Sequence, residues 1–339
     1  MSRRIEGVLP YWLDRPDEEA LDIALEVSRA GLDTLWIGEM ATFDAVALAT
    51  AIGHRTPGLR LKIGPLAVGV RSPVSIALAA SSVETLTDSE VGLALGASSP
   101  VIVSGWHDRE WAHSASRMRE AIGCLRELLA GQRSSYDGRH VRTHGFRLRR
   151  PRPHMHISVA AFGPAMTRVA ARHADEVVLN LVPPEHVRTV RATVDAEAAA
   201  AGRTAPGLAV WVPVALEPGD EARAQIAAQL AVYLGVPGYG EMFSALGFSE
   251  VVGRARQGAR RSELARSIPS DLLEQIGAVG TLEDVAARIS AYHDAGADVV
   301  GVVPSTAEDP GGRRVLGAVS ERFEQQPPVM PSSQKEIAS

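Results

Sequence analysis

The stretch SVAAFGPAMTRVAARHADEVVLNL, residues Ser158 to Leu181, holds the three elements of one supersecondary unit. The apolar run Ile157–Ala161 predicts a strand, and a helical pattern begins directly after Gly163-Pro164. A second apolar run, Glu176–Leu181, predicts the next strand. Proline suits the first helical position, because its fixed φ matches the helix and its missing N–H would have had no partner. The stretch therefore predicts a strand, a tight turn, a helix and a second strand.

The Gly-Pro turn has two interpretations. Glycine lets the backbone approach a ligand closely, and the N–H groups of Gly163, Ala165 and Met166 would point out of the helix N-terminus. That end carries partial positive charge and binds phosphate readily. The alternative is a tight turn that binds nothing, and the stretch alone favours neither interpretation.

The same alternation of apolar runs and helical patterns extends along the whole chain. Strands that alternate with helices predict βα units and a parallel sheet, and eight such units favour a closed (β/α)8 TIM barrel. An open, doubly wound sheet is the alternative. The eight predicted strands are Ile5–Pro10, Thr34–Gly38, Leu59–Val68, Val91–Gly96, Ile157–Ala161, Glu176–Leu181, Leu208–Ala215 and Asp298–Val303.

Two connections are long enough to hold insertions. The first covers residues 97–156 and contains Asp137-Gly138, a hairpin signal. The second covers residues 216–297 and contains several helical patterns. In a barrel, long segments on the carboxyl side of the strands build the substrate pocket. We expect one barrel domain over residues 1–324, with helical insertions, and a flexible C-terminal tail over 325–339, which is rich in Pro, Ser and Gln.

The composition indicates a soluble globular protein. Of 339 residues, 45% are hydrophobic and 22% charged, and the net charge of −5 gives no reason to expect binding to nucleic acid or to a membrane. A single cysteine and an N-terminus without an apolar signal segment fit the cytoplasm. The 35 basic residues include only two lysines, Lys62 and Lys335, an arginine bias typical of a GC-rich genome.

The barrel prediction gives a short set of candidate site residues, because barrel active sites lie at the carboxyl ends of the strands. His154 and His156 have the spacing of a metal pair but precede a strand, on the opposite face, so we expect no metal site. The candidates that follow strand ends are Tyr11, Trp12, Glu39, Met40, Leu66, Ala67, Val68, Gly69, Ala97, Ser98, Ser99, Trp106, His107, Phe162, Gly163 and Asn180.

Several of these candidates have a structural alternative. His107 is the histidine best placed for acid–base work, or else an exposed loop residue. Glu39 either contacts a cofactor or accepts structural hydrogen bonds. Trp12 and Trp106 either flank a flat ligand or fill the barrel mouth.

Five stretches together resemble the bacterial luciferase-like flavoproteins, and in particular the coenzyme F420-dependent branch that includes methylene-tetrahydromethanopterin reductase. Their order and spacing extend the resemblance from Ile5 to about Phe323. The stretches are AGLDTLWIGEM, LKIGPLAVGVRSPVSIALAASSVETLT, RMREAIGCLRELLAG, VAAFGPAMTRVAARHADEVVLN and VGTLEDVAARISAYHDAGADVVGVVP.

The resemblance implies roles for individual residues. It places the cofactor phosphate on the loop after strand five and a non-proline cis peptide near Leu66-Ala67, and it makes Glu39 an acidic cofactor contact. Met40 stands where the sugar-phosphate dehydrogenase branch has a proton-transferring histidine, so that chemistry is not expected. We assign catalysis to His107 and Glu39 and substrate contact to Trp12, Met40 and Trp106. The expected cofactor contacts are Glu39, Leu66, Ala67, Val68, Ser98, Ser99, Gly163, Pro164, Ala165, Met166 and Asn180.

The resemblance implies an F420-dependent oxidoreductase that transfers a hydride between the deazaflavin and a small organic substrate. Central metabolism and natural-product tailoring are both open. The first alternative is an FMN-dependent two-component monooxygenase, and the second is a flavin-binding barrel without catalysis. We expect a homodimer.

Overall fold

The computed structural model describes residues 3–324, and the tail expected at 325–339 lies outside the described residues. Within them, eight parallel strands close into a barrel, because the last strand of the series pairs with the first and β8 pairs with β9. In ring order the strands are β1 (Arg4–Val8), β2 (Thr34–Ile37), β3 (Arg60–Ala67), β4 (Val91–Gly96), β7 (Ile157–Ala160), β8 (Glu176–Asn180), β9 (Gly207–Leu216) and β11 (Val299–Pro304).

The predicted barrel and each of its eight strands are confirmed, and the open sheet is wrong. The sequence did not predict the short strand β10 (Ala278–Gly280), which pairs with the carboxyl end of β9 outside the ring. This strand has only three residues, with Gly277 before it and Gly280 at its end, so it has too few apolar residues for a strand pattern to be recognised in the sequence.

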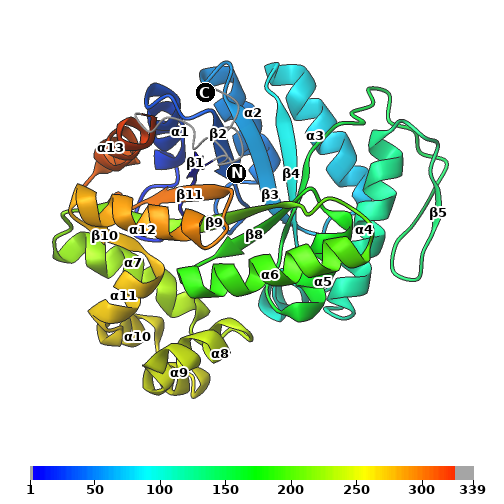
Figure 1. Cartoon of the computed structure of the whole chain (residues 1–339). Coiled ribbons are helices and arrows are strands. Elements are labelled where there is room, and N and C mark those ends of the chain that lie inside the picture. Colours follow the sequence, from blue (N-terminus) through cyan, green and yellow to red (C-terminus); the bar gives the residue numbers. More distant parts are fainter. Residues whose placement is uncertain (1–2, 325–339) are drawn as a thin grey trace, which may run out of the picture.

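Helices follow the strands and cover the outside of the barrel (Figure 1). Their inward faces pack on the strands through one continuous apolar layer, which contains Ile23, Ile52, Ile76, Leu125 and Val187. The covering helices are α1 (Glu19–Arg29), α2 (Ala45–Arg55), α3 (Pro73–Thr87), α4 (Ser114–Leu129), α5 (Pro164–His173), α6 (Pro184–Ala200), α12 (Leu282–Asp294) and α13 (Arg313–Glu324).

The first insertion forms the predicted hairpin. Strands β5 (Ser135–Asp137) and β6 (Arg142–His144) pair antiparallel, and they project from the side of the barrel beside α4 (Figure 1). The carboxylate of Glu120 on α4 accepts hydrogen bonds from the backbone N–H groups of His140 and Val141 at 2.7 and 3.0 Å. This side chain fixes the hairpin turn to the barrel.

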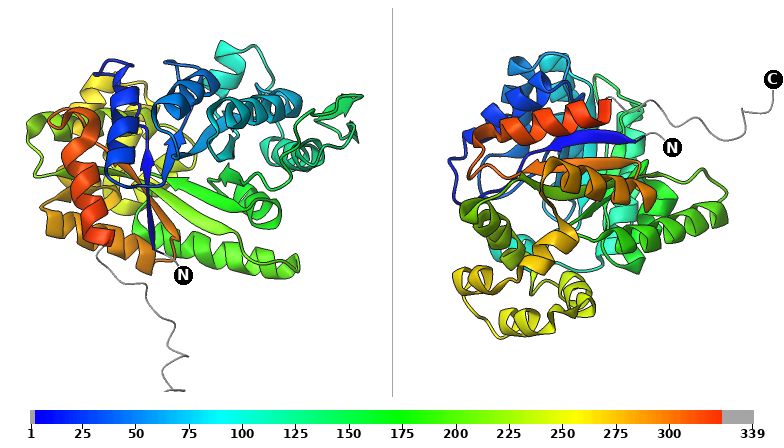
Figure 2. Two further views of the ribbon diagram at one scale, coloured as in Figure 1. Left: turned by 90° about the horizontal axis from the view of Figure 1, so that it is seen from above. Right: turned by 60° about the vertical axis from the view of Figure 1, so that its left-hand side comes forward.

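The second insertion is a cluster of helices that protrudes from the barrel (Figure 2). Helix α10 packs against α7, and a second apolar cluster joins these helices to the inside of the barrel through Trp36 and Trp211. The insertion therefore closes over one end of the barrel rather than folding apart from it. Its elements are α7 (Asp220–Tyr233), α8 (Tyr239–Phe243), η2 (Ser244–Phe248), α9 (Ser249–Arg256), α10 (Arg261–Ser267) and α11 (Ser270–Ile276).

Candidate active site

The loop after β7 has the geometry that its sequence predicts. Helix α5 begins at Pro164, and Gly163 precedes it with φ of 82°. A Cβ on Gly163 would meet no atom within 4 Å, so the space in front of the loop is open. The Gly163 carbonyl accepts a hydrogen bond from Thr167 N–H at 3.1 Å, whereas the first N–H groups of the helix face away from it. The loop is thus an unobstructed helix N-terminus at the barrel mouth.

Strand β3 carries the predicted irregularity, but its cis bond is elsewhere than expected. The register with β4 shifts between Ile63 and Leu66, which marks a bulge. The non-proline cis bond expected near Leu66-Ala67 is wrong: the cis bond in the described residues is Gly64-Pro65. Gly64 has φ of 126°, and a Cβ there would lie 2.1 Å from the Ala94 carbonyl oxygen. Only glycine fits between these two strands.

The side chains of the three bulge residues point in different directions. Leu66 and Val68 are buried in the apolar layer between the barrel and its helices, whereas Ala67 is partly exposed. Of the three, Ala67 therefore offers its side chain to the mouth, and Leu66 and Val68 can offer only their backbone.

Glu39 at the end of β2 is held by an arginine that the sequence analysis missed. Nε of Arg71 donates to Glu39 at 3.1 Å, and the same guanidinium is bonded to Asp44. Asp44 in turn accepts from Val46 N and Ala47 N at 2.9 and 3.0 Å and caps α2. The bond from Arg71 to Glu39 raises the pKa of the guanidinium. This ion cluster, Glu39–Arg71–Asp44, fixes the acidic candidate on the rim of the mouth.

The loop after β4 forms a π-helix, η1 (Val101–Trp106), which the sequence analysis did not predict. Ser98 precedes it with φ of 62°, and the Ser99 hydroxyl accepts from Ile102 N–H at 3.4 Å. Trp106 is 54% exposed, and His107 is exposed at the end of the helix. Both side chains lie on the predicted face of the barrel, but neither is enclosed by it.

Trp12, in contrast, is only 7% exposed. Its indole N–H donates to the carbonyl oxygen of Pro304 at the end of β11, at 2.9 Å. The ring therefore fills the barrel mouth, and its polar atom is already satisfied. Met40 is half-buried beside Glu39.

Four aromatic rings form a wall at the mouth, and of these the sequence analysis named only Phe162. His186, Phe162, Tyr239 and Tyr233 contact one another in that order, with ring centroids 5.5, 4.2 and 5.0 Å apart. Burial raises the pKa of both tyrosine hydroxyls, and the nearby side chain of Asn180 at the end of β8 opposes that shift. The tyrosines come from α7 and α8, and no local pattern could reveal that the second insertion returns them to the mouth.

A charged cluster fills the barrel interior below the mouth. Nζ of Lys62 lies 3.0 Å from carboxylate oxygens of both Glu6 and Glu176 and 4.2 Å from the centre of the Trp36 ring. Trp36 donates to Glu6 at 2.6 Å, and the Ser158 hydroxyl donates to Glu176 at 2.8 Å. Burial raises the pKa of Glu6, although the Lys62 ammonium opposes that shift. The sequence flagged Lys62 only as a rare lysine.

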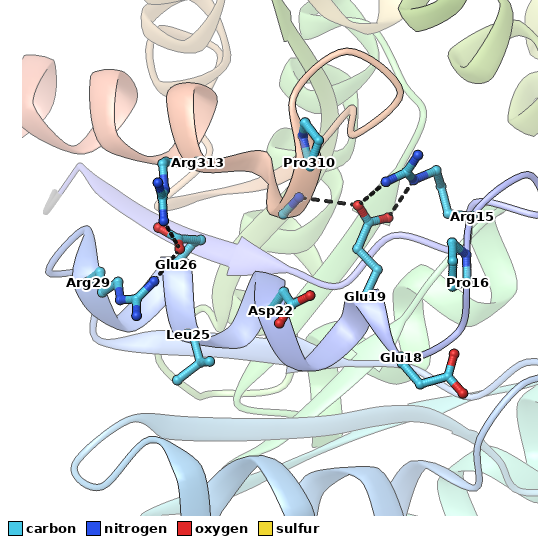
Figure 3. Close-up of a pocket in the computed structure, with 11 residues that line it drawn as sticks. Arg15, Pro16, Glu18, Glu19, Asp22, Leu25, Glu26, Arg29, Pro310 and Arg313 are labelled. Carbon is cyan, nitrogen blue, oxygen red and sulfur yellow. Dashed lines mark hydrogen bonds and ion pairs between the residues drawn. The ribbon is translucent and has the colours of Figure 1, made fainter.

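A side cavity of about 470 Å³ lies between α1 and the start of α13, outside the barrel mouth (Figure 3). Its charges are largely paired: Glu19 accepts from Arg15, and Glu26 accepts from Arg29 and Arg313. The cavity therefore offers no convergent set of groups for catalysis. Within residues 3–324 no three His, Cys, Asp or Glu side chains are grouped to hold a metal ion, and no helix is long and apolar enough to cross a membrane.

Comparison with known proteins identifies this architecture. The family model of the luciferase-like monooxygenases matches residues 12–299. The 5,10-methylenetetrahydromethanopterin reductase of Archaeoglobus fulgidus is 27% identical over 328 residues, which cover 91% of this chain and 96% of the relative.

Solved structures with lower identity show the same fold. The coenzyme F420-dependent tetrahydromethanopterin reductase from Methanopyrus kandleri aligns with a TM-score of 0.76 at 16% identity, over 94% of this chain and 98% of that one. The oxygenating constituent of 3,6-diketocamphane monooxygenase from Pseudomonas putida, solved with FMN, aligns with a TM-score of 0.70 at 16% identity, over 95% and 98%.

Proposed function

Because the chain belongs to the luciferase-like monooxygenase family, we propose that it is an F420-dependent oxidoreductase which transfers a hydride between the deazaflavin and a small organic substrate. The observation that carries this proposal is the open N-terminus of α5 at Gly163-Pro164, at the same end of the barrel as the bulge of β3. The chain is also similar to a putative coenzyme F420-dependent oxidoreductase of Mycobacterium tuberculosis, 24% identical over 333 residues that cover 88% of this chain and 94% of the relative. Bound F420 would supply a carbon-centred hydride donor.

On this proposal, the residues of the mouth hold and orient the cofactor. The N–H groups of the Gly163–Met166 loop would bind its phosphate, and the backbone at Leu66, Ala67 and Val68 would support its ring system. Glu39, Ser98, Ser99 and Asn180 would also contact the cofactor. Catalysis would rest mainly on positioning and on exclusion of water.

The phosphate loop does not distinguish F420 from FMN, because both cofactors carry a phosphate and a tricyclic ring. Similarity to the putative coenzyme F420-dependent oxidoreductase of Mycobacterium tuberculosis favours F420, and the FMN-bound structural neighbour keeps a monooxygenase as the alternative. The substrate contacts proposed are Met40, Trp106 and the ring face of Trp12. His107, exposed at the end of η1, is the acid–base residue that the sequence offers.

Titration of the purified protein with F420 and with FMN tests this proposal. We expect tight binding of F420, much weaker binding of FMN, and turnover that consumes no oxygen. Tighter binding of FMN together with oxygen-dependent turnover would replace the proposal by a two-component monooxygenase. Binding of F420 without hydride transfer to any member of a broad substrate panel would favour a non-catalytic flavin-binding barrel.

We also propose that the protein is a homodimer that pairs through α3. Leu78 and Leu86 on this helix are 51% and 62% exposed. The only charged residue of α3, Glu84, is bonded to Arg152 of the same chain. A solvent-facing helix without free charge is expected to pack against a partner.

A further inference from the structure

Two side-chain donors without a hydrogen-bond partner lie inside the described barrel: the hydroxyl of Tyr11 and the indole N–H of Trp211. Trp211 belongs to the middle of β9 and packs edge-on against Trp36, with ring centroids 5.4 Å apart. Tyr11 follows β1 and lies nearer the mouth. A buried donor without a partner is costly, and in an active site it marks the place of an acceptor that a ligand supplies.

The backbone opposite Tyr11 is adapted to its hydroxyl. A Cβ on Gly38 would lie 1.8 Å from the hydroxyl oxygen, so the phenol occupies the space that any other residue would fill at the end of β2. The ring is partly exposed, while the hydroxyl itself is buried. Burial raises the pKa of Tyr11, and the nearby Tyr233 and Glu39 act in the same direction. The hydroxyl therefore stays protonated at neutral pH and acts as a donor.

The other polar groups of the mouth are already engaged. Glu39 is bonded to Arg71, and the hydroxyls of Tyr233 and Tyr239, which lie close to the Asn180 side chain, are not among the buried atoms without a partner in residues 3–324. His107 is exposed beyond η1. Of these groups, the Tyr11 hydroxyl is the one that is both enclosed and unpartnered.

The surroundings also indicate the class of ligand. The aromatic wall of His186, Phe162, Tyr239 and Tyr233 presents partly exposed rings, which suit a flat, ring-shaped molecule. Burial lowers the pKa of His186, so its imidazole is neutral at pH 7. The Glu39–Arg71–Asp44 cluster sets two carboxylates against one guanidinium and disfavours an anionic substrate.

We propose that this mouth reduces a neutral cyclic carbonyl compound and that Tyr11 donates the proton to its oxygen. The inference rests on the proposed function. Bound F420 in its reduced form would supply a hydride to the carbonyl carbon and be oxidised, while the π electrons of the C=O bond move to the oxygen. The oxygen takes the proton of Tyr11, whose O–H electron pair remains on the phenolate. Water entering after product release returns that proton, and alcohol oxidation follows the same steps in reverse.

The test uses the full chain loaded with reduced F420 under anaerobic conditions. The protein is mixed with neutral ketones of one to four rings, or with the same ketones carrying a carboxylate. The rate at which each ketone oxidises the reduced cofactor is measured in a single turnover. We expect the neutral ketones to react faster than the carboxylated ones. Tyr11→Phe should lower the rate by about 10²-fold or more, with unchanged affinity for F420. Tyr136→Phe, on the distant hairpin, is the matched control and should react as the wild type.

A second readout does not depend on turnover. The fastest ketone, labelled with ¹³C at its carbonyl, is bound to the protein loaded with oxidised F420, and its C=O stretch is recorded by infrared spectroscopy. A hydrogen bond from Tyr11 should lower that frequency relative to the same complex of Tyr11→Phe. An equal frequency in both proteins would overturn the assignment of the donor.

Other outcomes separate this inference from the proposed function. Normal F420 binding without reduction of any neutral ketone would overturn the substrate class alone. If His107→Gln lowers the rate and Tyr11→Phe does not, the proton donor is His107 and the assignment to Tyr11 is wrong. Failure to bind F420 would instead contradict the proposed function.

Discussion

At the scale of single residues, Gly163 is the position where backbone geometry and proposed function meet. Its φ of 82° and ψ of 158° lie in a region that is essentially restricted to glycine, where a residue with a side chain costs about 1–3 kcal/mol, although a Cβ would meet no neighbouring atom. We expect Gly163→Ala to shift the loop and to weaken F420 binding by 10-fold or more, because hydrogen bonds to a charged phosphate contribute about 1.5–3 kcal/mol.

Gly145 provides a matched control for this substitution. It has the same φ of 82° and equally open surroundings, but it lies beside the hairpin. Gly145→Ala should therefore lower stability in urea by a similar amount and leave F420 affinity unchanged. F420 affinity is measured by fluorescence titration. Equal affinities of the two variants would contradict the proposal that the phosphate binds at the α5 loop.

Lys62 is the one lysine within residues 3–324, and its position inside the barrel explains why an arginine does not stand there. A compact ammonium with three donors can serve Glu6 and Glu176 at once inside a narrow barrel. Lys62→Met would leave Glu176 without this cation and Glu6 with only the Arg4 guanidinium at 3.7 Å, and should lower the free energy of unfolding by about 3–5 kcal/mol. Urea denaturation measures this loss, and Lys62→Met combined with Glu176→Gln should recover part of it.

The stability of Lys62→Met should also depend on pH in a defined direction. The pKa of Glu6 is already raised by burial, and loss of the ammonium would raise it further. A carboxyl whose pKa is higher in the folded than in the unfolded state contributes stability below its unfolded value near 4.5, and that contribution is lost as pH rises. The deficit relative to the wild type should therefore be larger at pH 8 than at pH 5. A deficit independent of pH would contradict the buried-carboxylate account.

At the scale of elements, α3 is the helix whose exposed face has no explanation within one chain. If Leu78 and Leu86 form a dimer interface, Leu78→Glu should place a charge in an apolar contact and convert the dimer to monomers. Light scattering at a fixed protein concentration measures the change. Leu13→Glu, at a residue 76% exposed outside α3, adds the same charge and should leave the dimer intact. A monomeric wild type would contradict the proposal.

The elements also show what local patterns could and could not predict. The strands, the start of α5 and the Asp137-Gly138 hairpin follow from short-range apolar periodicity and turn residues, and they are confirmed. The π-helix after β4 has no such signature, since an extra residue per turn leaves no distinct spacing. The cis bond was placed by resemblance at Leu66-Ala67, whereas Gly64-Pro65 in the same segment was visible in the sequence.

At the scale of the whole molecule, the barrel rule predicted which end of each strand carries the candidate residues, because parallel strands bring their carboxyl ends together. It could not predict partners that arrive from distant segments. Arg71 reaches Glu39 from the loop after β3, and Tyr239 reaches Phe162 from an insertion of helices. Tertiary packing alone decides these contacts, and no local sequence pattern encodes them.

The central claim is that this mouth binds F420 with its phosphate on the α5 N-terminus. A crystal structure of the protein with F420 tests it most directly. We predict phosphate oxygens within hydrogen-bonding distance of the backbone N–H groups of Ala165 and Met166, and the deazaflavin ring against the β3 bulge at Gly64–Val68. A phosphate bound elsewhere, such as in the side cavity between α1 and α13, or a ring outside the barrel mouth would contradict the account.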